Sequence, residues 1–185
     1  MPIKNINDNA PELGGAVSGF VTSMINAPAQ ADRPYILGSA VIAVRPTGAT
    51  EPAKVSVGKG AVVKGIMALG VQQTRPRGRL VKSGYADSAN NFVQGGVVYG
   101  ALDLANHDNA VLEATDAVLM TDKNGVFSYV TSAKAKTLTE LTAVTSGVSV
   151  AGIIHTTAIQ PALNETIGAN EFNYAEGIGA IALKL

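Results

Sequence analysis

The side chains best suited to acid–base chemistry in this chain are two histidines, and the sequence contains no cysteine. His107 lies in a short polar segment, and His155 follows the apolar pair Ile153–Ile154. Nucleophilic catalysis would need a nucleophile and an orienting acid beside one of them in space, and sequence neighbours cannot show such an arrangement. The serine-hydrolase motif G-x-S-x-G and the phosphate-binding motif G-x-x-x-x-G-K-[ST] are absent. We therefore expect no enzyme activity and no cofactor, with one histidine in a solvated loop and the other at a strand end.

A metal site is the second chemistry that the sequence could support. Asp122 and Asn124 could begin a calcium-binding loop, but the later acidic ligands of such a loop are missing. The pair Asn124-Gly125 is instead typical of a tight turn between two strands. Sites built from histidine and carboxylates need more than two histidines or a tight acidic cluster. We expect no metal, although four acidic residues lie close together along the chain: Asp103, Asp108, Glu113 and Asp116.

The order of the charged residues is more informative than any motif. Charged residues make up 15% of the chain and the formal net charge is zero, yet the charges form two long blocks of a single sign. Folding could interleave these blocks on one surface. Alternatively, it could create two oppositely charged faces suited to self-assembly or to a charged partner. The basic block, 52–86, holds Lys54, Lys59, Lys64, Arg75, Arg77, Arg79 and Lys82, and the acidic block, 87–122, holds Asp87, Asp103, Asp108, Glu113, Asp116 and Asp122.

The densest basic part of the chain is the segment 75–79, whose Pro76 and Gly78 predict an exposed turn. A nucleic-acid surface would interleave aromatic rings with the basic residues, and no aromatic residue occurs between Tyr35 and Tyr85. The zero net charge also argues against nucleic acid as a partner. We expect this segment to be a protein-docking loop with four candidate contact residues: Arg75, Arg77, Arg79 and Lys82.

The elements that must position these residues are strands. Short runs rich in Val and Ile alternate with Gly, Pro, Asn or Asp, and turn signals recur roughly every 8–12 residues. This rhythm predicts an all-β fold, either an antiparallel β-barrel or a jelly-roll-like sandwich. The longest nearly apolar run, 35–44, is too short to span a bilayer, so we expect no membrane partner. The expected strands include 35–37, 40–44, 54–57, 61–63, 66–69, 80–81, 92–93, 97–99, 117–120 and 126–130.

The remaining segments complete a single β domain, 16–185, preceded by an extended N-terminal arm, 1–15. Residues 132–141 could form a helix capped by a serine, although three threonines in or near this stretch weaken that prediction. The polar, asparagine-rich stretch 155–176 predicts a long loop. The final residues, 177–185, alternate between larger apolar side chains and Ala or Lys, which predicts a half-buried strand.

The order of these features resembles the capsid decoration, or structural cement, proteins of tailed bacteriophages. The resemblance covers about residues 55–185. It implies a β-barrel or jelly-roll fold, no enzyme activity, and binding to the outside of an icosahedral shell at junctions between capsomers. The stretch 155–176 is longer than that family leads us to expect. The residues that carry the resemblance are the glycine-bounded strand 60–66, the segment 79–85, the segment 92–99 with its Gly-Gly-x-Val-Tyr pattern, the Asn124-Gly125 hairpin, and the strand 178–185.

The resulting hypothesis is a structural virion protein that binds the capsid exterior and cements neighbouring capsid subunits. Its partners would be the major capsid protein and further copies of itself, as a dimer or a trimer. Its location would be the capsid surface of the virion, after synthesis in the host cytoplasm. The alternatives are a tail or baseplate β domain, a receptor- or glycan-binding module, and a β-barrel enzyme without a recognisable signature. Glycan binding normally uses exposed aromatic rings, and this chain has no Trp, five Tyr and four Phe.

Overall fold

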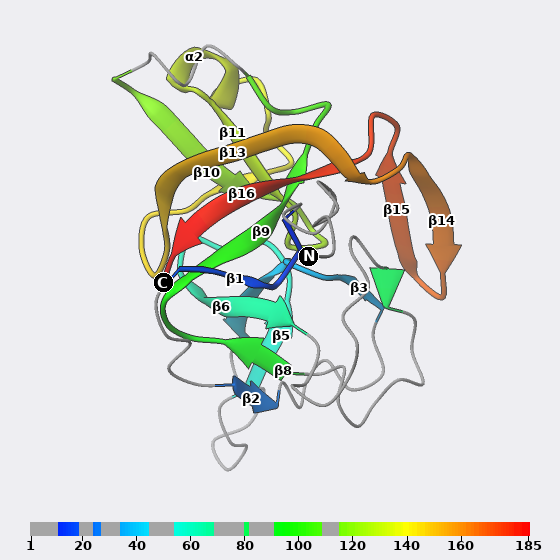
Figure 1. The fold of residues 1–185 in the computed structure, drawn as a ribbon. Helices are drawn as coiled ribbons and strands as arrows, with labels where there is room; N and C mark the ends of the chain where they lie inside the picture. The colour runs from blue at the N-terminus through cyan, green and yellow to red at the C-terminus, as the bar shows by residue number, and fades with distance from the viewer. Residues whose placement is uncertain are drawn as a thin grey trace, which may run out of the picture.

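The protein is almost entirely β-structure in the parts of the chain that its computed structural model describes, which confirms the expected all-β fold class. The described residues are 11–18, 24–26, 34–44, 54–68, 80–81, 91–108 and 115–185. Their strands form a seven-stranded sheet, a five-stranded sheet and two two-stranded sheets (Figure 1). Apart from β1, which pairs with β9 beside the main path, the strand order in each sheet is linear. Buried side chains of the two larger sheets pack against each other, as in a sandwich.

The seven-stranded sheet has the order β12-β10-β11-β9-β16-β13, and β1 pairs with β9 beside this path. All its pairings are antiparallel except the contact of β9 with β11, where Leu102 lies opposite Phe127. In Figure 1 the long strands β13 and β16 run together across the upper half of the molecule. The strands span Ala16–Ser18 (β1), Val97–Asp103 (β9), Ala117–Thr121 (β10), Phe127–Thr131 (β11), Thr142–Ala143 (β12), Ser149–Gln160 (β13) and Ile178–Lys184 (β16).

The five-stranded sheet has the order β2-β8-β6-β4-β5 and is antiparallel throughout. It lies in the lower half of Figure 1. Two further antiparallel pairs, β3 with β7 and β14 with β15, complete the described strands. Their bounds are Met24–Asn26 (β2), Tyr35–Ile36 (β3), Ala40–Val44 (β4), Lys54–Val57 (β5), Val63–Ala68 (β6), Leu80–Val81 (β7), Asn91–Val93 (β8), Leu163–Ile167 (β14) and Asn170–Tyr174 (β15).

The core consists of two clusters of apolar side chains, one on each face of strands β9 and β16. In one cluster, Ile66 of the five-stranded sheet packs with Leu102, Phe127, Ile181 and Leu183 of the seven-stranded sheet. The other cluster lies on the opposite face of β9 and β16 and collects side chains from several sheets. Its members include Leu13, Tyr35, Leu37, Met67, Phe92, Ala101, Leu163, Phe172, Tyr174 and Ile178.

The prediction of a half-buried strand at 177–185 is wrong, because residues 178–183 of β16 are buried on both faces. β16 lies between β9 and β13, with Ile178 opposite Asp103 and Lys184 opposite Val97. The alternation in the sequence reflects two different cores rather than a core and solvent. Ala180 faces one cluster, and Ile181 and Leu183 face the other.

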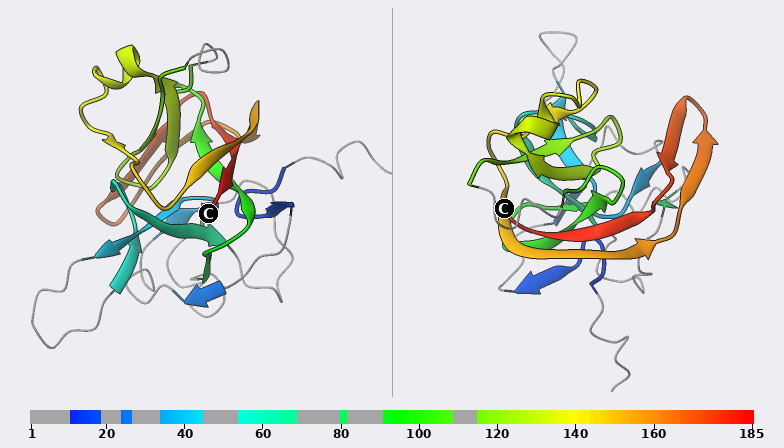
Figure 2. Two further views of the ribbon diagram at one scale, coloured as in Figure 1. Left: turned by 90° about the vertical axis from the view of Figure 1, so that its left-hand side faces the viewer. Right: turned by 90° about the horizontal axis from the view of Figure 1, so that it is seen from above.

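The prediction of a long loop over 155–176 is also wrong. β13 continues to Gln160, and the rest forms the β14–β15 hairpin. The hairpin turns at Gly168, where φ is +60°. Leu163, Phe172 and Tyr174 alternate with exposed polar residues and point into the core, so one face of the hairpin is buried and the other is solvated. Because polar residues separate the apolar ones along the sequence, the stretch has the composition of a loop although it forms strands. Figure 2 shows the hairpin turned away from the direction of β13 and β16.

Two smaller expectations are corrected in the same way. The helix expected over 132–141 is the single turn α2, Ser132–Ala135, and its N-cap is Thr131, whose side chain accepts a hydrogen bond from the backbone N–H of Lys134. The described part of the expected arm, 11–15, packs in the core, with Leu13 only 1% exposed. Residues 1–10 of the arm lie outside the described residues.

Candidate functional site

The four predicted docking residues, Arg75, Arg77, Arg79 and Lys82, lie outside the described residues, so their positions remain predictions. Two other lysines of the basic block, Lys59 and Lys64, are described and exposed. The Lys59 amino group donates a hydrogen bond to the backbone oxygen of Glu140 at 3.0 Å.

The acidic block does not form one exposed acidic face, because two of its carboxylates are internal hydrogen-bond acceptors. Asp103 is 8% exposed and accepts from the Ala105 backbone N–H at 3.0 Å and from the Asn106 amide at 2.8 Å. Burial raises the pKa of Asp103, and these hydrogen bonds partly offset that rise. Asp116, in contrast, is exposed. The block therefore combines structural carboxylates with surface ones.

The most developed polar site is the Asp122 cluster, which we define as Asp122, Asn124, Glu171 and Tyr174. The Tyr174 hydroxyl donates to Asp122 Oδ2 at 2.5 Å. The Asn124 amide donates to the Tyr174 hydroxyl at 3.0 Å and to the Glu171 backbone oxygen at 2.9 Å. These bonds join the turn between β10 and β11 to strand β15, which is about 50 residues away along the chain.

The turn that carries this cluster is shaped by Asp122 and Gly125. Asp122 Oδ1 accepts from the backbone N–H groups of Asn124 and Val126, both at 2.9 Å. The expected turn at Asn124-Gly125 is confirmed, but only the glycine has a positive φ, +74°. A Cβ at Gly125 would lie 2.7 Å from the Ala40 backbone oxygen, so glycine is required here by space as well as by conformation.

The electrostatics of the cluster favour a structural role over acid–base chemistry. Burial raises the pKa of Asp122, and the hydrogen bonds from Tyr174, Val126 and Asn124 counteract that rise. Burial and the neighbouring Asp122 carboxylate raise the pKa of Tyr174, so its hydroxyl stays protonated and donates. A cavity of about 170 Å³ borders these residues and Asp103. The arrangement can fasten the β14–β15 hairpin to the core.

The two histidines occupy separate places. His155, on β13, has its Nε2 3.1 Å from the Tyr99 hydroxyl, and the two rings meet edge to face with centroids 5.3 Å apart. The Ala180 and Ala182 side chains of the intervening strand β16 lie opposite His155 and Tyr99, and their small size lets the rings meet across it. His107 Nδ1 lies 3.2 Å from the backbone oxygen of Tyr129. Among the described residues, no group of three or more His, Asp or Glu could hold a metal ion.

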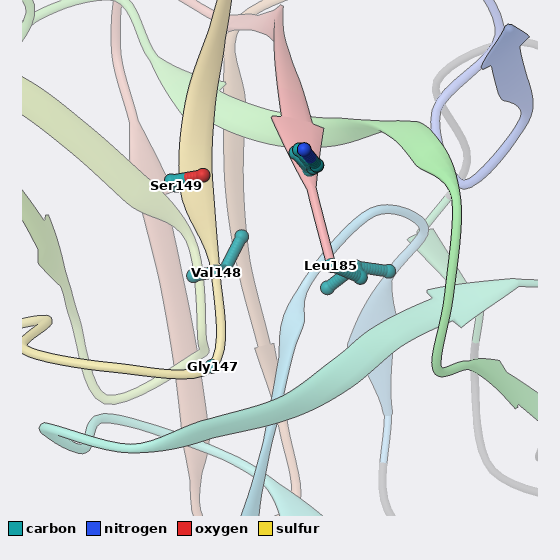
Figure 3. A pocket seen from close by; sticks show the side chains of 5 residues that line it. Gly147, Val148, Ser149 and Leu185 are labelled. Carbon is teal, nitrogen blue, oxygen red and sulfur yellow. The ribbon is translucent and has the colours of Figure 1, made fainter.

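An open groove lies where β13 begins and β16 ends. Its volume is about 410 Å³, and it is lined by Gly147, Val148, Ser149, Lys184 and Leu185 (Figure 3). Gly147 has a φ of +90°, and a Cβ there would lie 1.8 Å from the Val63 backbone oxygen, so the chain passes very close to β6 at this point. The groove is lined by apolar side chains, one serine and one lysine, and it is open to solvent rather than enclosed.

The longest strand in the described part of the chain is β13, and its last residues, 155–160, belong to the stretch that the sequence predicts as a loop. β13 is the terminal strand of the seven-stranded sheet and has 12 residues, most of them exposed. Its Ile153 is 43% exposed. The sequence does show that the stretch from Ser149 to Gln160 contains no Lys, Arg, Asp or Glu. Only the topology shows that this stretch is the edge of a sheet.

Comparison with known proteins identified no relative of this chain: no family model, no curated protein and no solved structure matches it. None of the helices in the described part of the chain is long and apolar enough to cross a membrane.

Proposed function

We propose that this protein is a structural virion component that binds the outside of an icosahedral phage capsid and cements neighbouring capsid subunits. The observation that carries the proposal is the placement of the segments that resemble decoration proteins. The Gly-Gly-x-Val-Tyr strand, β9, pairs over its whole length with β16. The glycine-bounded segment 60–66 enters β6, which pairs with β8 at the start of the segment 92–99. Four of the resembling segments thus contribute to the two larger sheets or to the turn between β10 and β11, while the segment 79–85 contributes β7 to a separate pair with β3.

The described surface also supports a binding role. The chain has few charges and a buried, closely packed core, and its most connected polar cluster fixes a hairpin rather than opening a reactive site. A cement protein needs a rigid domain with complementary contact surfaces, since its work is binding alone. The basic segment 75–79 is the proposed electrostatic contact with the capsid.

The test uses purified protein and expanded capsids that lack a decoration protein. After incubation over a range of salt concentrations, co-sedimentation should show saturable binding with a fixed number of copies per capsid. Binding should weaken as salt rises, because screening reduces the contribution of the basic segment. Absence of binding at every salt concentration would refute the proposal. Selective binding on a glycan array without capsid binding would favour a receptor-binding module instead.

A charge-reversal pair tests the basic segment separately. Arg77→Glu combined with Arg79→Glu should weaken capsid binding about tenfold at low salt, since each reversal removes one favourable surface pair and adds a repulsion. The matched control reverses Lys134 and Lys136, which lie in and directly after α2 and give the same change in net charge. If both double variants bind equally well, the basic segment is not the contact, even if the capsid proposal stands.

A further inference from the structure

Strand β13 has a long backbone edge that no described strand covers. It is the outermost strand of the seven-stranded sheet, and β16 pairs with it on its inner side (Figure 2). The strand has 12 residues, Ser149–Gln160. An edge strand presents unpaired N–H and C=O groups, which can pair with a strand from another molecule.

β13 lacks most of the features that normally protect such an edge. Native edge strands are kept from pairing by charged residues, proline, short length or bulges, and of these β13 has only bulges. β13 contains no Lys, Arg, Asp, Glu or Pro. Its Ile153 is 43% exposed, and its one titratable residue, His155, makes its contact with Tyr99 on β9. No charge on this strand opposes the approach of a second strand.

β13 does contain bulges, and these shape the edge. Its register with β16 shifts between Val150 and Ile154 and again between His155 and Gln160. Gly152, with a φ of +96°, lies within the first shift and has open space where a Cβ would be. Bulges bend a strand and increase its twist, which makes it a poor match for a straight foreign strand. A second copy of β13 has the same twist, and a two-fold axis lets the two twisted sheets continue into each other.

The length of the edge also points to a second copy as its occupant. The other end of the same sheet is β12, with two residues, and the ends of the five-stranded sheet are β2 and β5, with three and four. The hairpin strands β14 and β15 have five residues each. Among the described strands, only β13 of another molecule offers an edge of equal length. Antiparallel pairing of the two edges would bring no like charges together.

We infer that β13 pairs with β13 of a second copy in antiparallel orientation, forming a two-fold symmetric dimer with one continuous sheet. The inference concerns the protein without a capsid. It can therefore fail while capsid binding stands, and capsid binding can fail while it stands. Across a two-fold axis the same strand of both copies forms the contact. This contact therefore produces dimers and cannot by itself produce a trimer.

The absence of native cysteine allows a direct test by disulfide trapping. Directly opposite residues of an antiparallel pair have Cα atoms about 4.5–5.5 Å apart, within the range that a disulfide spans. Four exposed positions of β13, Ile153, Thr156, Thr157 and Ala158, are each replaced by Cys in separate variants. Under mild oxidation, covalent dimer should be strongest at one position near the two-fold axis and should decrease on both sides. Thr166→Cys, on the exposed face of β14, is the matched control and should give little.

Light scattering supplies the second measurement. The wild-type protein should have about twice the chain mass of 18.9 kDa, and the double variant Ile153→Lys, Thr157→Lys should shift to the mass of one chain. Thr166→Lys should remain dimeric. Far-UV circular dichroism identifies any variant that has unfolded. If the lysine variants unfold, the disulfide pattern still tests the inference. A monomeric or trimeric wild type, or cross-linking on β13 no stronger than at Thr166, would overturn the inference.

Discussion

The hydroxyl of Tyr174 offers the sharpest test of how the β14–β15 hairpin is held. It donates to Asp122 Oδ2 at 2.5 Å and accepts from the Asn124 amide at 3.0 Å. The ring itself is buried in the core, with 3% of the residue exposed. Tyr174→Phe keeps the ring and its apolar contacts and removes only the oxygen. The change in the free energy of unfolding therefore measures the hydrogen bonds rather than a cavity.

The expected loss can be estimated from the two bonds. A hydrogen bond to a charged group contributes about 1.5–3 kcal/mol to the stability of a protein. The Asn124 amide loses its bond to the Tyr174 hydroxyl but retains its bond to the Glu171 backbone oxygen at 2.9 Å, so this second bond contributes little to the change in stability. We expect Tyr174→Phe to lower the free energy of unfolding by about 2 kcal/mol, which corresponds to about 4–8 °C in Tm for a chain of this size. The loss should be greatest above the pKa of Asp122, where the acceptor is charged.

Urea unfolding followed by circular dichroism measures this loss, and a double-mutant cycle with Asp122→Asn assigns it. The two substitutions should be strongly non-additive, because both alter the same charged bond: Tyr174→Phe removes its donor, and Asp122→Asn removes the charge of its acceptor. Tyr129→Phe is the matched control, since the Tyr129 hydroxyl makes no hydrogen bond to the described residues, and its effect should stay within about 0.5 kcal/mol. A loss below about 0.5 kcal/mol for Tyr174→Phe, or additive effects in the cycle, would show that apolar packing alone holds the hairpin.

Two further predictions concern pH and backbone space. Burial raises the pKa of Asp103 and of Asp122 above 3.8, so the folded state binds more protons than the unfolded state. The stability that they contribute is present below pH 3.8 and is lost as the pH rises through the raised pKa values. Asp103→Asn should therefore gain stability relative to wild type with increasing pH in that range, as measured by urea unfolding at each pH, and a constant difference would contradict the assignment. Gly147→Ala and Gly168→Ala both place alanine at a positive φ, which costs about 1–2 kcal/mol, but only Gly147→Ala also meets the Val63 backbone oxygen. Thermal unfolding should show the larger loss for Gly147→Ala, and equal losses would mean that the backbone moves aside.

The strands of the core could be predicted from the sequence because their signal is local. In the runs at 40–44 and 126–130, Val, Ile and aromatic residues lie between turn residues, and strands form there. The β14–β15 hairpin was not predicted because exposed Asn, Thr and Glu residues lie between Leu163, Phe172 and Tyr174 along the sequence and give the stretch the polar composition of a loop. Counting apolar residues at every second position, instead of judging the average polarity, would have detected it.

The candidate sites were harder to predict because they depend on strand pairing between distant segments. Asp122 was expected in a turn, but its partner Tyr174 is 52 residues further along the chain. No spacing within the sequence indicates that these two side chains meet. The uncharged stretch 149–160 was visible, but whether it is a central strand or an edge depends on which strand lies beside it.

The position of β16 between β9 and β13 has a consequence for biosynthesis. β16 leaves the ribosome after every other described strand, and β13 has no neighbour in its sheet until β16 arrives. A translation product that stopped before Ile178 would leave adjacent edges of β9 and β13 uncovered, with both apolar clusters incomplete. Such products are prone to aggregation and to proteolysis. Only chains that include β16 can close the sheet, so the topology itself favours translation products that extend at least to Lys184.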